Sequence, residues 1–498
     1  MSRQVFNPFL PEEAYIPDGE PHVFGDRIYL FGSHDMEGGE SFCILDYEGW
    51  SASVHDLSQW KSAGIIYSAK QDPGYSEKRP YMYAPDVVQG NDGRYYLYYC
   101  LAGWKGEGGY DGPISVAVCD SPNGKYEYLG FVRNEDGTEF QECVLFDPAV
   151  INDEGVIRLY TGTGLPWGWE ITKWNYLLTA GIAERMYHRP KSEFKAKKNP
   201  LGAYMVELCD DMLTVRGKAK KILPKATKRN GYKGHAFFEG ASIRKHNGMY
   251  YFIYSSQKNH ELCYAISMYP DREFRYGGTL VSNGDIGYKG RTDEQRLNAT
   301  GTTHGSIEKI NGQWYVFYHR LSHGSDYSRQ ACAEPITIKE DGSIEQVEMT
   351  SCGLNGGPLK PEGVIPATKA CNLTNGNMPH IGNSKYEDPI PIVTNQGDEH
   401  YIAGITDGTL VGFKYFDFPA DVFTVKVSVR GTGSGKLVFY ADEQMEHAIA
   451  HLDITPQKEW IQQQISCSAV QGIRPLYLKY SGNGEVELLY MEMTVCKS

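Results

Sequence analysis

The sequence lacks any long hydrophobic run. No stretch of its 498 residues approaches the roughly 18 apolar residues that a membrane-spanning helix needs. The first residues, MSRQVFNPFLPEE, have no apolar core of the kind that signal peptides carry. We therefore expect a protein that stays in the cytoplasm and has no membrane partner.

An excess of positive charge is also absent. The chain has 49 Lys and Arg against 62 Asp and Glu, which gives a formal net charge of −13. This charge would repel nucleic acid and anionic lipid. We therefore exclude nucleic-acid binding and expect a neutral partner, while the sequence sets no oligomeric state.

Cysteine pairing patterns are missing as well. The 11 Cys residues are scattered, odd in number and without a CxxC motif. This distribution argues against a disulfide framework or a zinc site and is typical of a reducing compartment. Most of these side chains should therefore serve as small buried apolar groups.

Aromatic residues are abundant, at 13% of the chain, and five segments of the first 350 residues share one pattern. Each has an acidic or His residue, a few apolar or small residues, a short turn with Gly or Asn, and an aromatic-rich run. Period-two alternation, as in Tyr96, Tyr98 and Cys100, indicates strands, and turns such as NDG and HNG are those of tight hairpins. The polar residues that lead the five segments are Asp18, Asp86, Asp147, Glu239 and His304.

These lead residues lie between 61 and 92 positions apart. That spacing is a little more than the roughly 40 to 50 residues of one four-stranded propeller blade. We therefore predict an all-β fold with a five-bladed β-propeller in residues 1–352. The one oversized spacing contains a helical run around residues 168–186, which we interpret as an insertion in the third blade. Its Trp167, Trp169 and Trp174 would either pack the insertion onto the propeller or stack against a sugar ring.

The composition changes near residue 352. A Gly- and Pro-rich stretch, CGLNGGPLKPEGVIPATK, is typical of a linker, and strand-like runs such as FTVKVSV and EVELLYMEM follow it. Short strands at regular spacing favour a second domain of the β-sandwich type. We assign residues 353–498 to this linker and sandwich.

The lead residues should converge, because the innermost strands of all blades face one central axis. Carboxylates forced together in a narrow funnel cost free energy through desolvation and repulsion, so stability alone would not favour them. Their pKa values are driven apart, which lets one act as a general acid and another as a base. Glycoside hydrolysis requires this division of labour. Taken singly, each Asp could be an ordinary turn residue.

The segments IPDGEPHVF, YMYAPDV, LFDPAVI, FFEGASI and HGSIEKINGQWYVFYHR resemble glycoside hydrolase family 43, a family of five-bladed propellers. The resemblance implies that Asp18 is the general base, Asp147 the pKa modulator and Glu239 the general acid. It also implies inversion at the anomeric centre and no cofactor required for the chemistry.

Further site residues are expected from the same resemblance. It implies that Asp86 in YAPDV contacts substrate beside Tyr83, and that Arg320 in FYHRL points into the pocket. The alternatives are a structural role for Asp86 and a surface ion pair for Arg320. We add Trp167 as a sugar contact. His304 could help to hold a calcium ion, or it could hydrogen-bond to ordered water, since calcium sites are normally dominated by oxygen ligands.

We therefore expect an exo-acting, inverting glycosidase that releases α-L-arabinofuranose and β-D-xylose from arabinoxylan- and xylan-derived oligosaccharides. A predominantly β-xylosidase activity and an arabinan-acting arabinofuranosidase are alternatives, and a non-catalytic sugar-binding propeller is the alternative of another class. Retaining fructosidases are disfavoured because the WMNDPN- and RDP-type motifs are missing. The tail from YIAGITDGTLVGFKYFDFP onward resembles family 6 carbohydrate-binding modules.

Overall fold

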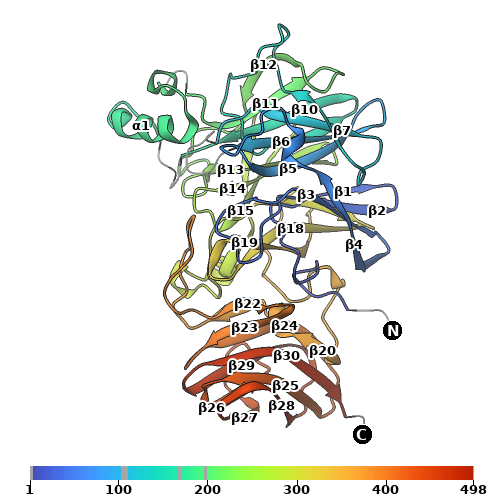
Figure 1. The fold of residues 1–498 in the computed structure, drawn as a ribbon, viewed down its shortest axis with the longest axis vertical. Coiled ribbons are helices and arrows are strands. Elements are labelled where there is room, and N and C mark those ends of the chain that lie inside the picture. The colour runs from blue at the N-terminus through green and yellow to red at the C-terminus, as the bar shows by residue number, and fades with distance from the viewer. Residues whose placement is uncertain (1–3, 103–109, 166–167, 169, 196–198, 497–498) are drawn as a thin grey trace.

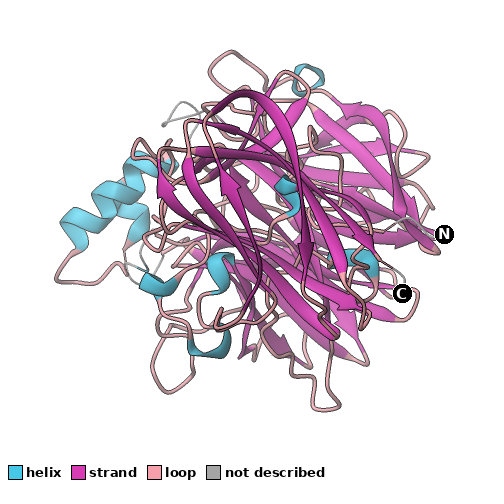
Figure 2. Cartoon of the chain, turned by 90° about the horizontal axis from the view of Figure 1, so that it is seen from below, coloured by secondary structure: helices cyan, strands magenta, loops and turns pink. Residues whose placement is uncertain are grey.

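A computed structural model describes residues 4–102, 110–165, 168, 170–195 and 199–496. Strands dominate the molecule (Figure 2). The N-terminal part forms one body and the C-terminal part a second, layered body beneath it in Figure 1. None of the helices in the described ranges is long and apolar enough to cross a membrane.

Five antiparallel sheets form the first body, in chain order. The first sheet contains β1 (Glu20–Phe24), β2 (Arg27–Phe31), β3 (Tyr47–Ser53) and β4 (Asp56–Tyr67). The second contains β5 (Tyr81–Gln89), β6 (Tyr95–Ala102), β7 (Ile114–Cys119) and β8 (Glu127–Phe131). The third contains β9 (Ala149–Asp153), β10 (Val156–Thr163), β11 (Gly202–Leu208) and β12 (Val215–Lys221). The fourth contains β13 (Phe237–His246), β14 (Met249–Ser256), β15 (Glu261–Ser267) and β16 (Arg275–Ser282). The fifth contains β17 (Ser306–Ile310), β18 (Gln313–Ser322) and β19 (Ser325–Ile336).

The predicted hairpins are present at the start of every sheet. In the fifth, Ile310 pairs with Gln313 across a turn in which Gly312 has a φ of 93°, a conformation that side-chain-bearing residues rarely adopt. The five-bladed propeller is thus confirmed. Its fifth sheet differs from the expected four strands, since it has three in the described residues.

The N-terminal segment closes the ring beside this fifth sheet. The side chain of Asn7 accepts from the N–H of Ala333 at 3.1 Å and donates to its carbonyl at 3.1 Å. Phe9 and Ile16 pack in one apolar cluster with residues of both the first and the fifth sheet. The two ends of the propeller are therefore joined by packing and by hydrogen bonds.

The insertion in the third sheet contains α1 (Tyr176–Tyr187), which lies at the side of the propeller (Figure 1). Its Ala180 and Ala183 are buried in a cluster with Phe194. Trp174 does not pack the insertion, because its side chain is 98% exposed. Short 3-10 helices are η1 (Ala69–Gln71), η4 (Lys191–Phe194), η5 (Asn283–Asp285), η6 (Tyr288–Gly290), η7 (Asp293–Gln295), η8 (Gly353–Asn355) and η9 (Ala367–Lys369).

The second body is a β-sandwich of two sheets, as predicted. One sheet has the order β22 (Ile392–Gln396), β23 (Glu399–Ile405), β30 (Val486–Val495), β25 (Phe423–Gly431) and β28 (Gln457–Cys467), with β20 (Gly363–Pro366) paired to β30. The other has the order β21 (Asn372–Thr374), β24 (Leu410–Phe418), β29 (Gly472–Asn483), β26 (Ser434–Tyr440) and β27 (Ala448–Ile454). Alternate residues of β25, such as Val425 and Val427, are buried in the core between the sheets.

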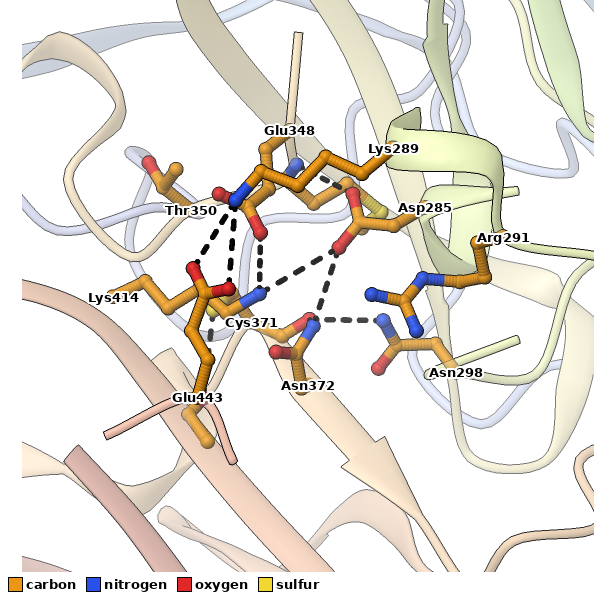
Figure 3. A network of polar contacts seen from close by, with 12 residues as sticks. Asp285, Lys289, Arg291, Asn298, Glu348, Thr350, Cys371, Asn372, Lys414 and Glu443 are labelled. Atoms are coloured by element: carbon orange, nitrogen blue, oxygen red, sulfur yellow. Dashed lines mark hydrogen bonds and ion pairs between the residues drawn. The ribbon is translucent and has the colours of Figure 1, made fainter. Parts of the chain in front are cut away.

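A buried polar network joins the two bodies (Figure 3). Lys414 on β24, only 2% exposed, lies 2.7 Å from a carboxylate oxygen of Glu348 and 3.8 Å from one of Asp285. Arg320 on β18 donates to the carbonyl of Ala370 at 2.7 Å and also to that of Thr368. Buried charges need such partners, so the propeller and the sandwich are held in one relative position.

Candidate active site

Asp18 lies two residues before β1 with a positive φ of 58°, and it is only 5% exposed. Nη1 of Arg329 on β19 is 2.9 Å from its Oδ1. Burial pushes the pKa of Asp18 up, but the charge of Arg329 helps to lower it below its usual value. Asp18 is therefore ionised at neutral pH.

His319 on β18 fixes the backbone of Asp18. The backbone N–H of Asp18 faces Nδ1 of this ring at 3.3 Å, so Nδ1 is the acceptor. The other ring nitrogen, Nε2, is then the donor to the carbonyl of Thr302 at 3.0 Å. Burial lowers the pKa of His319 to about 3, which keeps the ring neutral and fits this tautomer.

Asp147 and Glu239 line the same pocket as Asp18. Asp147 precedes β9 by two residues, and its Oδ2 accepts from the N–H of Gly240 at 3.0 Å. Burial and then the charge of Asp18 raise the pKa of Asp147 above its usual value. Desolvation and then the charge of Asp147 raise the pKa of Glu239 well above its usual value. Because the Gly240 hydrogen bond favours ionised Asp147, Glu239 holds the proton at neutral pH.

His304, two residues before β17, lies between the acids. Its Nδ1 is 3.9 Å from Oδ1 of Asp18 and 4.0 Å from Oδ2 of Asp147. Its buried Nε2 has no hydrogen-bond partner among the described residues. Calcium takes roughly six to eight oxygen ligands, and His304 belongs to neither of the potential metal-ligand clusters found in the described part of the chain. The role of His304 in holding a calcium ion therefore stays a prediction.

These residues line one pocket of about 400 Å³. Its volume falls in the range of roughly 300–1,000 Å³ that is typical of ligand sites. Aromatic side chains alternate with polar ones along its wall. The lining residues are Asp18, Phe42, Cys43, Tyr83, Tyr110, Phe146, Asp147, Thr163, Met186, Tyr187, Phe238, Glu239, Asn259, Thr302, Thr303, His304, Arg329, His380, Gly382 and Asn383.

Asp86 is not among them, so its predicted substrate contact is corrected. In each hairpin, one residue of the first strand forms the pair next to the turn. Asp18, Asp147 and His304 each lie six residues before that residue in their own hairpins. In the second sheet, the residue six positions before it is Tyr83. Asp86, three residues further on, is fully buried below the pocket. Its Oδ1 is 2.6 Å from Nε2 of His22, and its Oδ2 accepts from the N–H of Val150 at 2.7 Å.

An ion network joins the first strands of three blades. Arg244 on β13 lies 2.9 Å from Glu20 on β1 and 3.3 Å from Glu308 on β17. The pKa values of Glu20 and Asp86 are both raised to about 7, in each case chiefly by burial. None of these four residues lines the pocket.

Arg320 is also placed outside the pocket, where it joins the propeller to the sandwich. The arginine that faces the acids is Arg329, nine residues later on the neighbouring strand. The sequence held one signal for it, since Arg329 is the only basic residue in the strand SDYSRQACAEPI. Tyr83 lies in the pocket as expected, and Trp167 lies outside the described residues.

The arrangement combines an ionised carboxylate, a protonated carboxyl group and a third acid in one pocket. Such a set can protonate a leaving oxygen while it activates a water molecule. Sequence reasoning missed Arg329, the positioning role of His319, and the residues His380, Gly382 and Asn383 of the C-terminal domain.

Comparisons with known proteins agree with this geometry. Residues 7–344 match the profile of Glycosyl hydrolases family 43. Over 513 aligned residues, covering 100% of both chains, the sequence is 41% identical to a xylosidase/arabinosidase from Thermoclostridium stercorarium. A family 43 β-xylosidase/α-arabinofuranosidase from a compost microbial metagenome, solved with xylotriose in a calcium-free form, is 27% identical with a TM-score of 0.50, covering 67% of this chain and 94% of its own. The family 43 enzyme of Xanthomonas citri, solved with xylose, is 26% identical with a TM-score of 0.50, covering 67% and 90%. This chain belongs to glycosyl hydrolase family 43.

Proposed function

We propose that the protein is an exo-acting glycosidase that inverts the anomeric centre and releases α-L-arabinofuranose and β-D-xylose from xylan-derived oligosaccharides. One observation carries this proposal: an ionised Asp18, held by Arg329, shares a pocket with a Glu239 whose pKa is raised well above its usual value. A base and an acid are thus both ready at neutral pH.

The reaction follows from these two states. Asp18 takes a proton from a water molecule as the water attacks the anomeric carbon. Glu239 gives its proton to the glycosidic oxygen, so the bond to the leaving sugar breaks as the bond to water forms. Asp147 keeps Glu239 protonated until this step, because a second negative charge beside it is unfavourable.

The burial of the acids supports exo action, since Asp18 and Asp147 are only 5% and 4% exposed. Arg244, Glu20 and Glu308 pair with one another, and none of them lines the pocket. A terminal sugar can enter from the open side. Release of a single-sugar branch and removal of the terminal sugar of a chain are both compatible with such a pocket.

The names of relatives support the choice of sugars. The 41% identical relative is a xylosidase/arabinosidase, and the compost enzyme is a β-xylosidase/α-arabinofuranosidase. The two pentoses present overlapping hydroxyl arrangements to a pocket. The unpartnered Nε2 of His304 and the phenol of Tyr83 supply hydrogen-bonding groups for such hydroxyls.

The proposal is tested with aryl α-L-arabinofuranoside, aryl β-D-xyloside and arabinoxylan oligosaccharides. We expect release of both pentoses by the wild type, and a loss on the order of 100- to 10,000-fold in Asp18→Ala and Glu239→Ala. Proton NMR of the first product should show the inverted anomer. Wild-type turnover in Glu239→Ala, or a retained anomer, would refute the assigned mechanism.

A further inference from the structure

A loop of the sandwich domain reaches the active-site pocket. Residues 375–391 connect β21 and β22, which lie in different sheets of the sandwich. In Figure 1 this segment rises from the sandwich toward the propeller. Its His380, Gly382 and Asn383 line the same pocket as Asp18 and Glu239. The pocket is therefore made by both domains.

One end of this loop is hydrogen-bonded to the segment that carries His304. The N–H of Thr300 donates to the carbonyl of Pro379 at 3.0 Å, and the N–H of Ile381 donates to the carbonyl of Thr300 at 2.5 Å. The hydroxyl of Thr300 is also 3.0 Å from Nδ1 of His380. Thr300 itself is fully buried, so the anchor is a rigid part of the propeller.

The other end is fixed to the fifth blade. The N–H of Asn383 donates to Oδ2 of buried Asp326 at 3.3 Å, and the hydroxyl of Tyr327 donates to the carbonyl of Asn383. The N–H of Tyr386 donates to the carbonyl of Gly324 at 2.8 Å. Both main-chain polar groups of Asn383 are thus occupied by the propeller, and the residue itself lines the pocket.

The loop is more exposed than Asp18 and Asp147, so it lies nearer the mouth of the pocket. Asp18, Asp147 and His304 are between 4% and 6% exposed, whereas His380 and Asn383 are exposed. The sugar that is released must place its anomeric carbon between Asp18 and Glu239. The rest of the substrate then extends outward and passes the mouth.

We propose that His380 and Asn383, on the loop of residues 375–391, bind the leaving-group sugar and so set which oligosaccharides are cleaved. The inference rests on the proposed glycosidase function. The Asn383 amide offers both donors and acceptors, and the imidazole of His380 offers a second polar group, which suits the hydroxyls of a neutral pyranose. Tyr110, from the segment between β6 and β7, lines the same pocket and offers an aromatic face.

The test compares two substrates that share a glycone and differ in leaving group, aryl β-D-xyloside and xylotriose. In Asn383→Ala and in His380→Ala, kcat/KM for xylotriose should fall about three- to tenfold relative to kcat/KM for the aryl xyloside, as expected for one lost hydrogen bond. The fall should appear mainly in KM. Glu387→Ala is the matched control, because Glu387 is exposed on the same loop and does not line the pocket.

The outcomes separate the two proposals. Suppose that the wild type cleaves xylotriose and that both variants keep the wild-type ratio of kcat/KM for xylotriose to kcat/KM for the aryl xyloside. The loop inference is then wrong and the proposed function stands. An equal loss on both substrates also overturns it, since a general disturbance of the site would act in this way. A wild type that cleaves neither substrate overturns the proposed function and this inference with it. Thermal unfolding of each variant checks that the loop substitutions leave the fold intact.

Discussion

Nη1 of Arg329 lies 2.9 Å from Oδ1 of Asp18, and the same guanidinium donates to both carboxylate oxygens of Asp35, at 2.7 and 2.9 Å. All three side chains are buried. The fork geometry of arginine allows one side chain to pair with two carboxylates at once. Asp35 thus fixes the arginine, and the arginine fixes the charge and the position of Asp18.

Arg329→Lys should therefore impair catalysis although it keeps the charge. A lysine has one compact ammonium group and cannot make the bidentate contact with Asp35 while it also reaches Asp18. We expect kcat/KM on aryl glycosides to fall on the order of 100-fold, the size expected for a small displacement of a catalytic group.

The pH profile of kcat/KM in Arg329→Lys should shift in one defined direction. Asp18 acts as a base and must be ionised, so activity is lost as the pH falls through its pKa. Weaker pairing raises that pKa, and the acid limb of kcat/KM should move to higher pH. Arg320→Lys is the matched control, because Arg320 is equally buried on the neighbouring strand but faces Ala370 and Thr368. A shift of the acid limb in both variants would contradict the assigned role of Arg329.

Asp147→Asn should move the alkaline limb in the opposite direction. The charge of Asp147 raises the pKa of Glu239, so its removal lowers that pKa. Glu239 must be protonated, and activity should therefore be lost at a lower pH than in the wild type. Xylotriose should lose more kcat than an aryl xyloside, up to about 100-fold, because a poor leaving group needs the acid more. An alkaline limb that stays in place would show that Asp147 acts otherwise.

Asp86→Ala distinguishes between a structural role for Asp86 and the substrate contact predicted from the sequence. The substitution leaves His22 and the buried N–H of Val150 without their partner. An unsatisfied buried polar group costs about 1–3 kcal/mol. We expect a lower midpoint in thermal unfolding and a KM for aryl glycosides within about twofold of the wild type. A large rise in KM at unchanged stability would restore the contact inferred from the sequence.

Lys414→Met should destabilise the junction of the two domains. It removes the ammonium group that lies 2.7 Å from Glu348 and 3.8 Å from Asp285, and so leaves these two carboxylates without its charge in the interface shown in Figure 3. Breaking a buried pair in this way costs about 3–5 kcal/mol in the free energy of unfolding, measured with urea. The double variant Lys414→Met with Glu348→Gln should recover part of the loss. A double variant that is no more stable than the single one would argue against the pairing.

Much of the fold could be read from the sequence because hairpin signals are local. The turn that contains Gly312 and the alternating side chains of strands such as β6 are local features. They identify a hairpin without knowledge of the neighbouring hairpins. Five such signals in order predict a propeller, and Asp18, Asp147 and Glu239 then meet by the geometry of the ring. The last propeller strand, β19, ends at Ile336, and the first strand of the sandwich, β20, begins at Gly363.

The errors arose where a side chain's direction depends on packing. Asp86 opens a motif that looks equivalent to those of Asp18 and Asp147, but the hairpin register places Tyr83 at the pocket and Asp86 three residues deeper. Arg320 and Arg329 lie on paired strands, and only the assembled sheet decides which of them faces the acids.

The sequence by itself therefore determined the architecture, since it follows from patterns within single hairpins and from their repetition along the chain, and the resemblance to family 43 selected the acid trio from the five lead residues. Tertiary structure decided the partner of Asp18, the pairing of Arg244 with Glu20 and Glu308, and the entry of residues 375–391 into the pocket wall. Each of these is a contact between segments far apart in the chain, and such contacts follow from how the blades and the sandwich pack rather than from any local pattern.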